Sequence, residues 1–237
     1  MINKALLKTE ADKIGVFLDD TALERLDKYA ELLVETNMTL NLTAITEPDE
    51  IVYKHFIDSL SLLTCVEIKN GAKVIDVGTG AGFPGVVLLI ARPDLKITLL
   101  DGTNKRLVFI KNVLEEIGLE AEIVHMRAEL AGRNIKYREQ FDFVTARAVA
   151  NLNTLAEYCM PFVKVGGIFA PMKSAKTEDE VSAARGAIKT LGGKIAEIKP
   201  LNIANCGERY VIITEKISQT PPKYPRASAQ ISKKPLS

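Results

Sequence analysis

The stretch VIDVGTGAGFPG, residues 74–85, constrains the fold of this 237-residue chain more than any other. It starts with a short apolar run that is typical of a buried strand, and four glycines follow within eight positions. Glycines gather at such a turn where the backbone must approach a ligand closely and a Cβ would clash. The apolar run VVLLIA at 86–91 comes next. The stretch therefore predicts a strand, a tight turn that faces a ligand, and a helix.

The rest of the central region repeats this alternation of strand and helix. Short apolar runs predict strands at 73–78, 96–101, 121–126, 141–146 and 167–172. Helical patterns between them predict helices at about 84–92, 103–117, 151–160 and 177–190. Two final apolar runs, 194–201 and 208–216, predict a closing antiparallel pair. The predicted class is α/β, with a Rossmann-like, doubly wound sheet and a C-terminal hairpin.

The two ends of the chain predict structure of other kinds. Apolar residues at helical spacing predict helices at 20–37 and at about 46–63, so residues 1–66 are interpreted as a helical extension. Residues 67–216 then form the α/β domain. The tail, residues 217–237, holds four prolines, four basic residues and no acidic residue, and we expect it to be extended and mobile when no partner is present.

Composition excludes several classes of protein. Hydrophobic residues make up 47% and charged residues 26% of the chain, as in ordinary globular proteins. The longest apolar runs are too short to cross a bilayer and the N-terminus lacks the apolar region of a signal peptide, so we expect a cytoplasmic protein. The three cysteines form no Cys-x-x-Cys pair, which predicts buried free thiols and no metal site. The basic tail is compatible with a polyanionic partner.

The glycines fit two ligand-binding patterns at once. Residues 80–85 match the G-x-G-x-x-G of dinucleotide sites. Residues 78–82 match a G-x-G-x-G that follows an acidic residue, Asp76, as in S-adenosylmethionine sites. Both patterns require an acidic residue about 20 positions later to bind ribose hydroxyls, and Asp101 provides it. The glycines alone therefore leave both cofactors open.

Three further features favour S-adenosylmethionine. The carboxylate of Asp76 would repel a pyrophosphate, whereas it would suit the cationic amino group of a methionine moiety. Pro84 removes an N–H donor at the helix start, where a dinucleotide fold offers donors to phosphate. The segment FDFVTARAVANL, 141–152, does not resemble a nicotinamide site. A nicotinamide-dependent oxidoreductase remains the alternative from another class of enzyme.

Motifs spread along the chain resemble those of the RsmG (GidB) methyltransferases, which modify N7 of guanine 527 in bacterial 16S ribosomal RNA. The motifs are NLTAI (41–45), HFIDSL (55–60), DVGTGAGFPG (76–85), LLDGTNKR (99–106), RAE (127–129), ARAVA (146–150), and KYPR and KKPL in the tail. The family more often has DSLNKR in the fourth motif. The resemblance implies S-adenosylmethionine as cofactor and the 530 loop of 16S RNA, within the small ribosomal subunit, as substrate. A methyltransferase that acts on another RNA is the nearest alternative.

The resemblance also implies particular site residues. For the cofactor these are Gly78, Phe83, Ala128, Glu129 and Arg147, and Asp101 joins them from its position in the glycine pattern. Basic residues at carboxyl ends of strands or in the tail are the candidates for RNA contacts. They are Lys105, Arg106, Arg147, Lys173, Lys223, Arg226, Lys233 and Lys234.

The implied reaction requires no catalytic base. Guanine N7 carries no proton, so its lone pair is available for attack, and alignment of the reactants with desolvation can supply the catalysis. We therefore name no catalytic residue and interpret His55 and His125 as structural. We expect a monomer, because no long apolar patch is evident.

Overall fold

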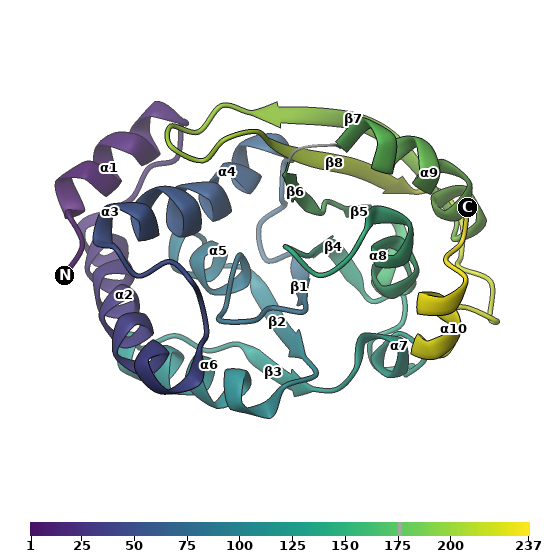
Figure 1. Ribbon diagram of the computed structural model, residues 1–237, viewed down its shortest axis with the longest axis horizontal. Coiled ribbons are helices and arrows are strands. Elements are labelled where there is room, and N and C mark those ends of the chain that lie inside the picture. Colours follow the sequence, from purple (N-terminus) through teal and green to yellow (C-terminus); the bar gives the residue numbers. More distant parts are fainter. Residues whose placement is uncertain (175–176) are drawn as a thin grey trace.

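The computed structural model describes residues 1–174 and 177–237 and contains one eight-stranded sheet (Figure 1). The strand order is β3-β2-β1-β4-β5-β8-β6, with β7 paired to β8. The strands are β1 (Lys73–Val77), β2 (Lys96–Asp101), β3 (Glu122–His125), β4 (Phe141–Thr145), β5 (Val163–Phe169), β6 (Met172–Ser174), β7 (Gly193–Leu201) and β8 (Arg209–Lys216). β1 to β5 are parallel to one another, whereas β8 runs antiparallel to β5, β6 and β7.

Helices cover both faces of this sheet. They are α1 (Lys4–Lys13), α2 (Asp20–Leu40), α3 (Pro48–Ile51), α4 (Asp58–Cys65), α5 (Gly85–Ala91), α6 (Asn104–Ile117), α7 (Ala128–Ala131), α8 (Leu152–Cys159), α9 (Thr177–Thr190) and α10 (Ser228–Lys233). A π-helical turn, η1 (Val52–Ile57), joins α3 to α4. The predicted α/β, doubly wound fold with its closing antiparallel pair is confirmed.

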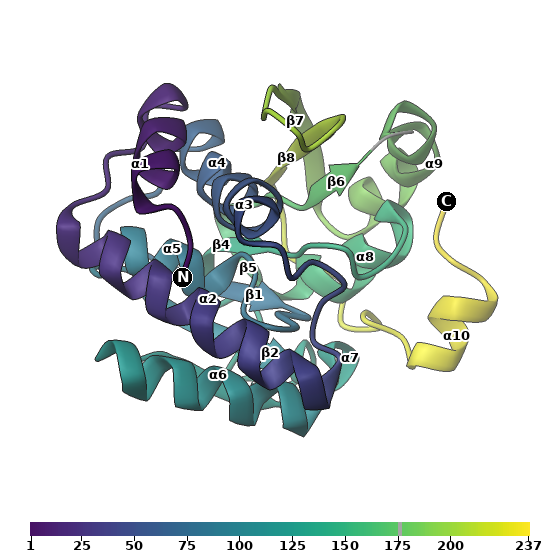
Figure 2. The ribbon, with the colours of Figure 1, turned by 60° about the vertical axis from the view of Figure 1, so that its left-hand side comes forward.

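Strand side chains alternate between two apolar cores. Val74 packs with the helices of the N-terminal half, and its neighbour Ile75 packs on the opposite face with α8 and α9. α2 lies across α6 on the first face (Figure 2). The helical extension therefore buries its apolar face on the sheet domain, and Tyr29 of α2 is fully buried there. Among the described residues, no helix is long and apolar enough to cross a membrane.

Some predicted boundaries are wrong. The strand expected at 167–172 is two strands, β5 and β6, because Pro171 has no N–H to continue a ladder. The helix α1 was not predicted, and the predicted helix at 20–37 continues to Leu40, where Asn41 ends it in the left-handed region at φ 48°. The three cysteines are buried free thiols, as expected.

The expectation of an extended and mobile tail is wrong. Residues 228–233 form α10, and the tail side chains of Tyr224 and Ile231 are buried. The body of the protein supplies donors to the tail carbonyls: Arg138 donates to Thr220, Pro221 and Tyr224. Proline lacks an N–H but keeps its carbonyl acceptor, so a proline-rich segment can dock where charged donors meet it.

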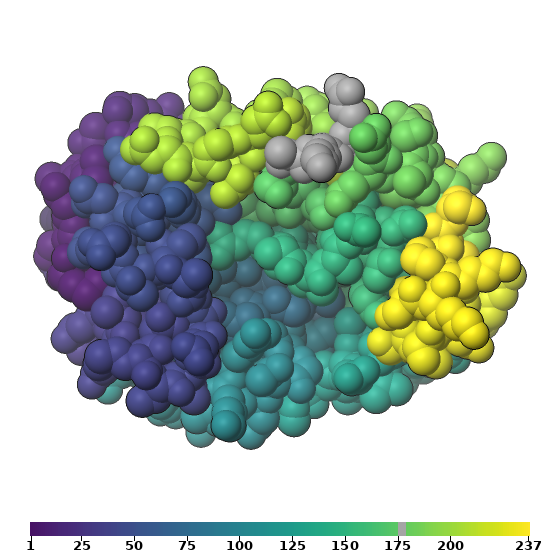
Figure 3. Space-filling view, viewed as in Figure 1, coloured from purple at the N-terminus to yellow at the C-terminus, as the bar shows by residue number. Residues whose placement is uncertain are grey.

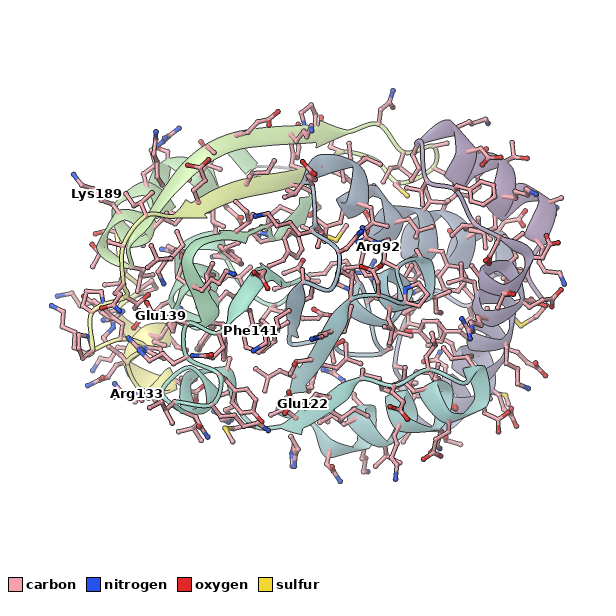
Figure 4. All side chains as sticks on the ribbon, turned by 180° about the vertical axis from the view of Figure 1, so that it is seen from behind. Arg92, Glu122, Arg133, Glu139, Phe141 and Lys189 are labelled. Atoms are coloured by element: carbon pink, nitrogen blue, oxygen red, sulfur yellow. The ribbon has the colours of Figure 1, made fainter. Side chains whose placement is uncertain are left out.

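A buried ion pair also anchors the tail. Glu157 of α8 is fully buried and accepts from the backbone N, Nε and Nη2 of Arg226, at 2.6–2.8 Å. Arg133 donates to the carbonyls of Lys223 and Pro225. From behind, Arg133 and Glu139 lie close to the yellow C-terminal segment (Figure 4). Arg226 is therefore part of the tail anchor, and its predicted contact with RNA stays a prediction.

We expect the substitution Arg226→Ala to lower the free energy of unfolding by about 2–3 kcal/mol, because it leaves the carboxylate of Glu157 buried without its cation. Urea denaturation measures the change. Lys234→Ala, at an exposed position of the same tail, is the control and should change stability by less than about 0.5 kcal/mol. The double substitution Arg226→Ala/Glu157→Gln should recover part of the loss. Equal stability of the two single variants would show that the pair does not anchor the tail.

Candidate functional site

A cavity of about 550 Å³ opens at the carboxyl ends of the parallel strands. Its walls come from the segments that follow β1, β2, β3 and β4, together with Leu42, Thr43 and His55 of the N-terminal extension. The space-filling view shows a hollow between the blue N-terminal helices and the green and yellow C-terminal part (Figure 3). This edge of a parallel sheet is where α/β folds bind ligands, because loops from several strands converge there.

The glycine turn after β1 forms the floor of the cavity. Gly80 has φ 61°, in the left-handed region, and a Cβ on it would meet nothing closer than 3.9 Å. Gly82 has φ 105°, and a Cβ there would lie 2.6 Å from the hydroxyl of Tyr29. Gly82 therefore allows α2 to approach the turn, whereas Gly80 leaves room on the cavity side.

Asp101, at the end of β2, fixes the turn from the neighbouring strand. Its Oδ2 accepts from the N–H of Gly80 at 3.0 Å, and its Oδ1 accepts from the N–H of Thr103 at 2.7 Å. The side chain is buried and lines the cavity, with Nη1 of Arg106 at 3.7 Å. Each carboxylate oxygen has a second lone pair, so Asp101 can also accept from ligand hydroxyls.

Asp76 does not line the cavity, and its expected place near the methionine amino group or the water bound to it stays a prediction. Asp76 is fully buried beneath the turn, where its Oδ2 accepts from Thr79 Oγ1 at 2.7 Å and from the N–H of Gly85 at 2.9 Å. Gly85 begins α5, so Asp76 occupies the donor that a dinucleotide fold would offer to phosphate. Burial raises the pKa of Asp76 to about 6, although the hydrogen bonds from Thr79 and Gly85 oppose this shift.

A stacked group of side chains forms one wall of the cavity. The ring of His55, which lies in the π-helical turn η1, stacks on Phe83 with centroids 4.3 Å apart. The guanidinium of Arg147, which follows β4, lies 5.0 Å from the centre of the same Phe83 ring. Arg147 donates to Asp58 Oδ2 at 2.9 Å and to the carbonyl of Lys54 at 3.1 Å, and it contacts His55 Nδ1 at 3.2 Å. The wall therefore joins the N-terminal extension to the sheet domain.

His55 is neutral in this wall. Burial and, after it, the charge of Arg147 lower the pKa of His55 to about 3. Because Arg147 has only donors, we assign the lone pair to Nδ1 and the proton to Nε2, which lies 2.9 Å from Thr43 Oγ1. Two of the motifs that carry the resemblance, NLTAI and HFIDSL, meet at this contact.

The residues predicted for the cofactor converge on the cavity. All six line it: Gly78, Phe83, Asp101, Ala128, Glu129 and Arg147. Among the residues predicted to contact RNA, Arg106 and Arg147 line the same cavity, Lys173 lines a neighbouring one, and Lys105 is exposed on the first turn of α6. Lys223, Lys233 and Lys234 are exposed on the tail.

Sequence reasoning missed the contribution of the HFIDSL motif. His55 lines both cavities and Asp58 lines the second. The available signal was the spacing of a histidine and an aspartate three residues apart on a predicted helix, which places them on one face. Within the described residues, no group of three or more histidine, cysteine or acidic side chains could hold a metal ion.

We expect the titration of Asp76 to contribute a rise of about 1 kcal/mol in the free energy of unfolding as the pH falls from 7 to 5. The pKa of Asp76 is about 6 in the folded state against 3.8 ordinarily, so the folded state takes up the proton first as the pH falls. Asp76→Asn keeps an acceptor for Thr79 and Gly85 but cannot titrate. Urea unfolding of both proteins at pH 7 and pH 5 measures the effect, and His55 contributes equally to both. Identical pH dependence of the two proteins would contradict the assignment.

Comparison with known proteins agrees with this geometry. The family model described as rRNA small subunit methyltransferase G (GidB) matches residues 22–209. Two proteins named ribosomal RNA small subunit methyltransferase G are similar over nearly their whole length. The one from Alkaliphilus metalliredigens is 46% identical and covers 100% of both chains. The one from Acetivibrio thermocellus is 47% identical and covers 98% of this chain and 96% of its own.

Solved structures are similar in fold. A SAM-dependent methyltransferase from Aquifex aeolicus matches with a TM-score of 0.55 and 15% identity, over 75% of this chain and 97% of its own. TrmN from Thermus thermophilus matches with a TM-score of 0.54 and 16% identity, over 68% of this chain and 48% of its own. At these identities the likeness supports the fold alone, whereas the match in sequence extends along the full chain. The chain therefore belongs to the rRNA small subunit methyltransferase G family.

Proposed function

We propose that this protein transfers a methyl group from S-adenosylmethionine to N7 of guanine 527 in the 530 loop of 16S ribosomal RNA. As a member of its family the protein is a methyltransferase with S-adenosylmethionine as its cofactor. The observation that carries the proposal is the convergence of all six predicted cofactor residues on one cavity at the carboxyl ends of the strands. We place the reaction in the cytoplasm, on the small ribosomal subunit or its precursor, with the enzyme as a monomer.

The residues of the cavity fit this cofactor. Asp101 and Glu129 are 5% and 8% exposed, and their carboxylates can accept from the ribose hydroxyls and the amino groups of the cofactor. Gly78 and Gly80 keep the floor free of side chains, and Phe83 adds an apolar surface. When bound, the cofactor supplies an electrophilic methyl group on a sulfonium.

The chain itself supplies orientation and not proton transfer. Guanine N7 attacks through its lone pair, so no proton has to be removed. His55 is neutral and held by Thr43 and Arg147, which makes it a rigid part of the wall and not a base. Orientation of reactants can lower a barrier by roughly 7–11 kcal/mol in favourable cases. A rigid wall of stacked and hydrogen-bonded side chains is suited to that task.

Basic residues around the cavity would position the RNA. Lys105 and Arg106 are exposed at the start of α6, beside the cavity mouth, and Lys173 lies next to the wall. Such residues contact phosphates and set the position of the strand, while the cavity selects the base. Lys223 and Lys233 of the docked tail add a second basic surface.

Methyl transfer to unmodified 16S RNA tests the proposal. We expect purified protein with labelled S-adenosylmethionine to label small subunits or deproteinised 16S RNA, and cleavage at 7-methylguanine to occur at position 527 alone. Asp101→Asn should weaken binding of S-adenosylhomocysteine at least about 10-fold. The amide is uncharged and has one acceptor oxygen, so it cannot accept from the N–H groups of both Gly80 and Thr103. Asp142→Asn, outside the cavity lining, is the control. Cleavage at another site, or label in another RNA only, would contradict the proposal.

A further inference from the structure

A second cavity of about 310 Å³ adjoins the first and shares His55, Arg147 and Ala148 with it. We propose that this cavity binds the target base, and that Asp58 selects guanine by accepting hydrogen bonds from its Watson–Crick edge. The inference rests on the proposed function, since it names where that substrate lies. The remaining lining residues are Ile45, Lys54, Met172, Lys173, Ser174 and Arg209.

Asp58 is a buried carboxylate with unused acceptor capacity. Its side chain is 3% exposed and lines the cavity. One oxygen, Oδ2, accepts from Arg147, whereas Oδ1 is buried and has no hydrogen bond from any described residue. Nε of Arg209 lies 3.5 Å from Oδ1 and supplies charge without a hydrogen bond. A buried acceptor without a donor costs free energy, and a ligand N–H in this cavity would offset that cost.

The charges of the cavity fit a nucleotide. Four cationic side chains line it, from Lys54, Arg147, Lys173 and Arg209, with one carboxylate, Asp58. Two of the cations also have partners outside the lining, since Lys54 pairs with Glu50 and Lys173 with Glu180. A purely anionic ligand would leave the acceptor Oδ1 of Asp58 without a donor, and an apolar ligand would leave both Oδ1 and the cations without partners on the ligand. A base that offers N–H donors and is linked to phosphates satisfies both the carboxylate and the cations.

An enzyme that methylates N7 of guanine should bind the base by its Watson–Crick edge. N7 lies on the Hoogsteen edge, opposite N1–H and the 2-amino group. A base held by its Watson–Crick edge keeps N7 free for attack, whereas a base held by its Hoogsteen edge would have N7 blocked. Adenine has an acceptor at N1 and no 2-amino group, so it would place a lone pair against the carboxylate.

The backbone between the two cavities is unusual. Ala148 lines both and has φ 56°, in the left-handed region that a residue with a Cβ rarely adopts. Strained residues persist where surrounding structure fixes them, and they concentrate at binding sites. Here the flanking Arg147 is fixed by its hydrogen bond to Asp58, and Nζ of Lys173 donates to the carbonyl of Ala150 at 3.0 Å.

The test compares guanosine with inosine, which lacks only the 2-amino group, at the target position of an otherwise identical 16S fragment. Rates of methyl transfer (kcat/KM) are measured for the wild-type protein, Asp58→Asn and the control Asp142→Asn. We expect the wild-type protein and the control to prefer guanosine by about 10- to 100-fold, the range for one hydrogen bond to a charged group. In Asp58→Asn the preference should fall to within about threefold. Affinity for S-adenosylhomocysteine, measured alongside, reports whether the first cavity is intact.

The possible outcomes distinguish failure of this inference from failure of the proposed function. Equal use of guanosine and inosine by the wild-type protein would overturn the inference without any variant, and so remains decisive if Asp58→Asn does not fold. An unchanged preference in folded Asp58→Asn would also overturn it, while transfer to guanosine leaves the proposed function standing. Absence of transfer to guanosine by the wild-type protein would overturn the proposed function and this inference with it.

Discussion

Two carboxylates at the ends of neighbouring strands hold the glycine turn on which the site depends. Asp76 lies beneath the turn and binds Thr79 and the first N–H of α5, while Asp101 binds the N–H of Gly80 from β2. Together they fix the backbone between β1 and α5 in a conformation that only glycines adopt readily. One of the two acids is thus structural, and the other faces the cavity.

The N-terminal extension completes the site and does not merely cover the sheet. Tyr29 of α2 donates to the carbonyl of Ala81, within the glycine turn. His55 and Asp58 of the extension contact Arg147 of the sheet domain, and His55 and Arg147 line both cavities. With the cofactor in the first cavity and the guanine in the adjoining one, as we propose, N7 could approach the methyl group directly where the two cavities meet, and the shared side chains would set its orientation.

The sequence predicted the parts of the molecule that depend on local pattern. The parallel strands follow apolar runs, and the six cofactor residues were identified by one pattern and one resemblance before their convergence was known. Local sequence patterns did not predict contacts between distant parts of the chain. The tail docks on Arg138, more than 80 residues away, and Asp58 contacts Arg147 across 89 residues. Pro171, by contrast, was a local signal for the break between β5 and β6.

We propose that cofactor and target base occupy the two adjoining cavities that share His55 and Arg147. A crystal structure with S-adenosylhomocysteine and guanosine monophosphate tests it most directly. We expect S-adenosylhomocysteine in the first cavity, in contact with Asp101, and the guanine ring in the second, with its Watson–Crick edge at hydrogen-bond distance from Asp58. A guanine ring that is bound elsewhere, or that turns its N7 edge toward Asp58, would contradict it.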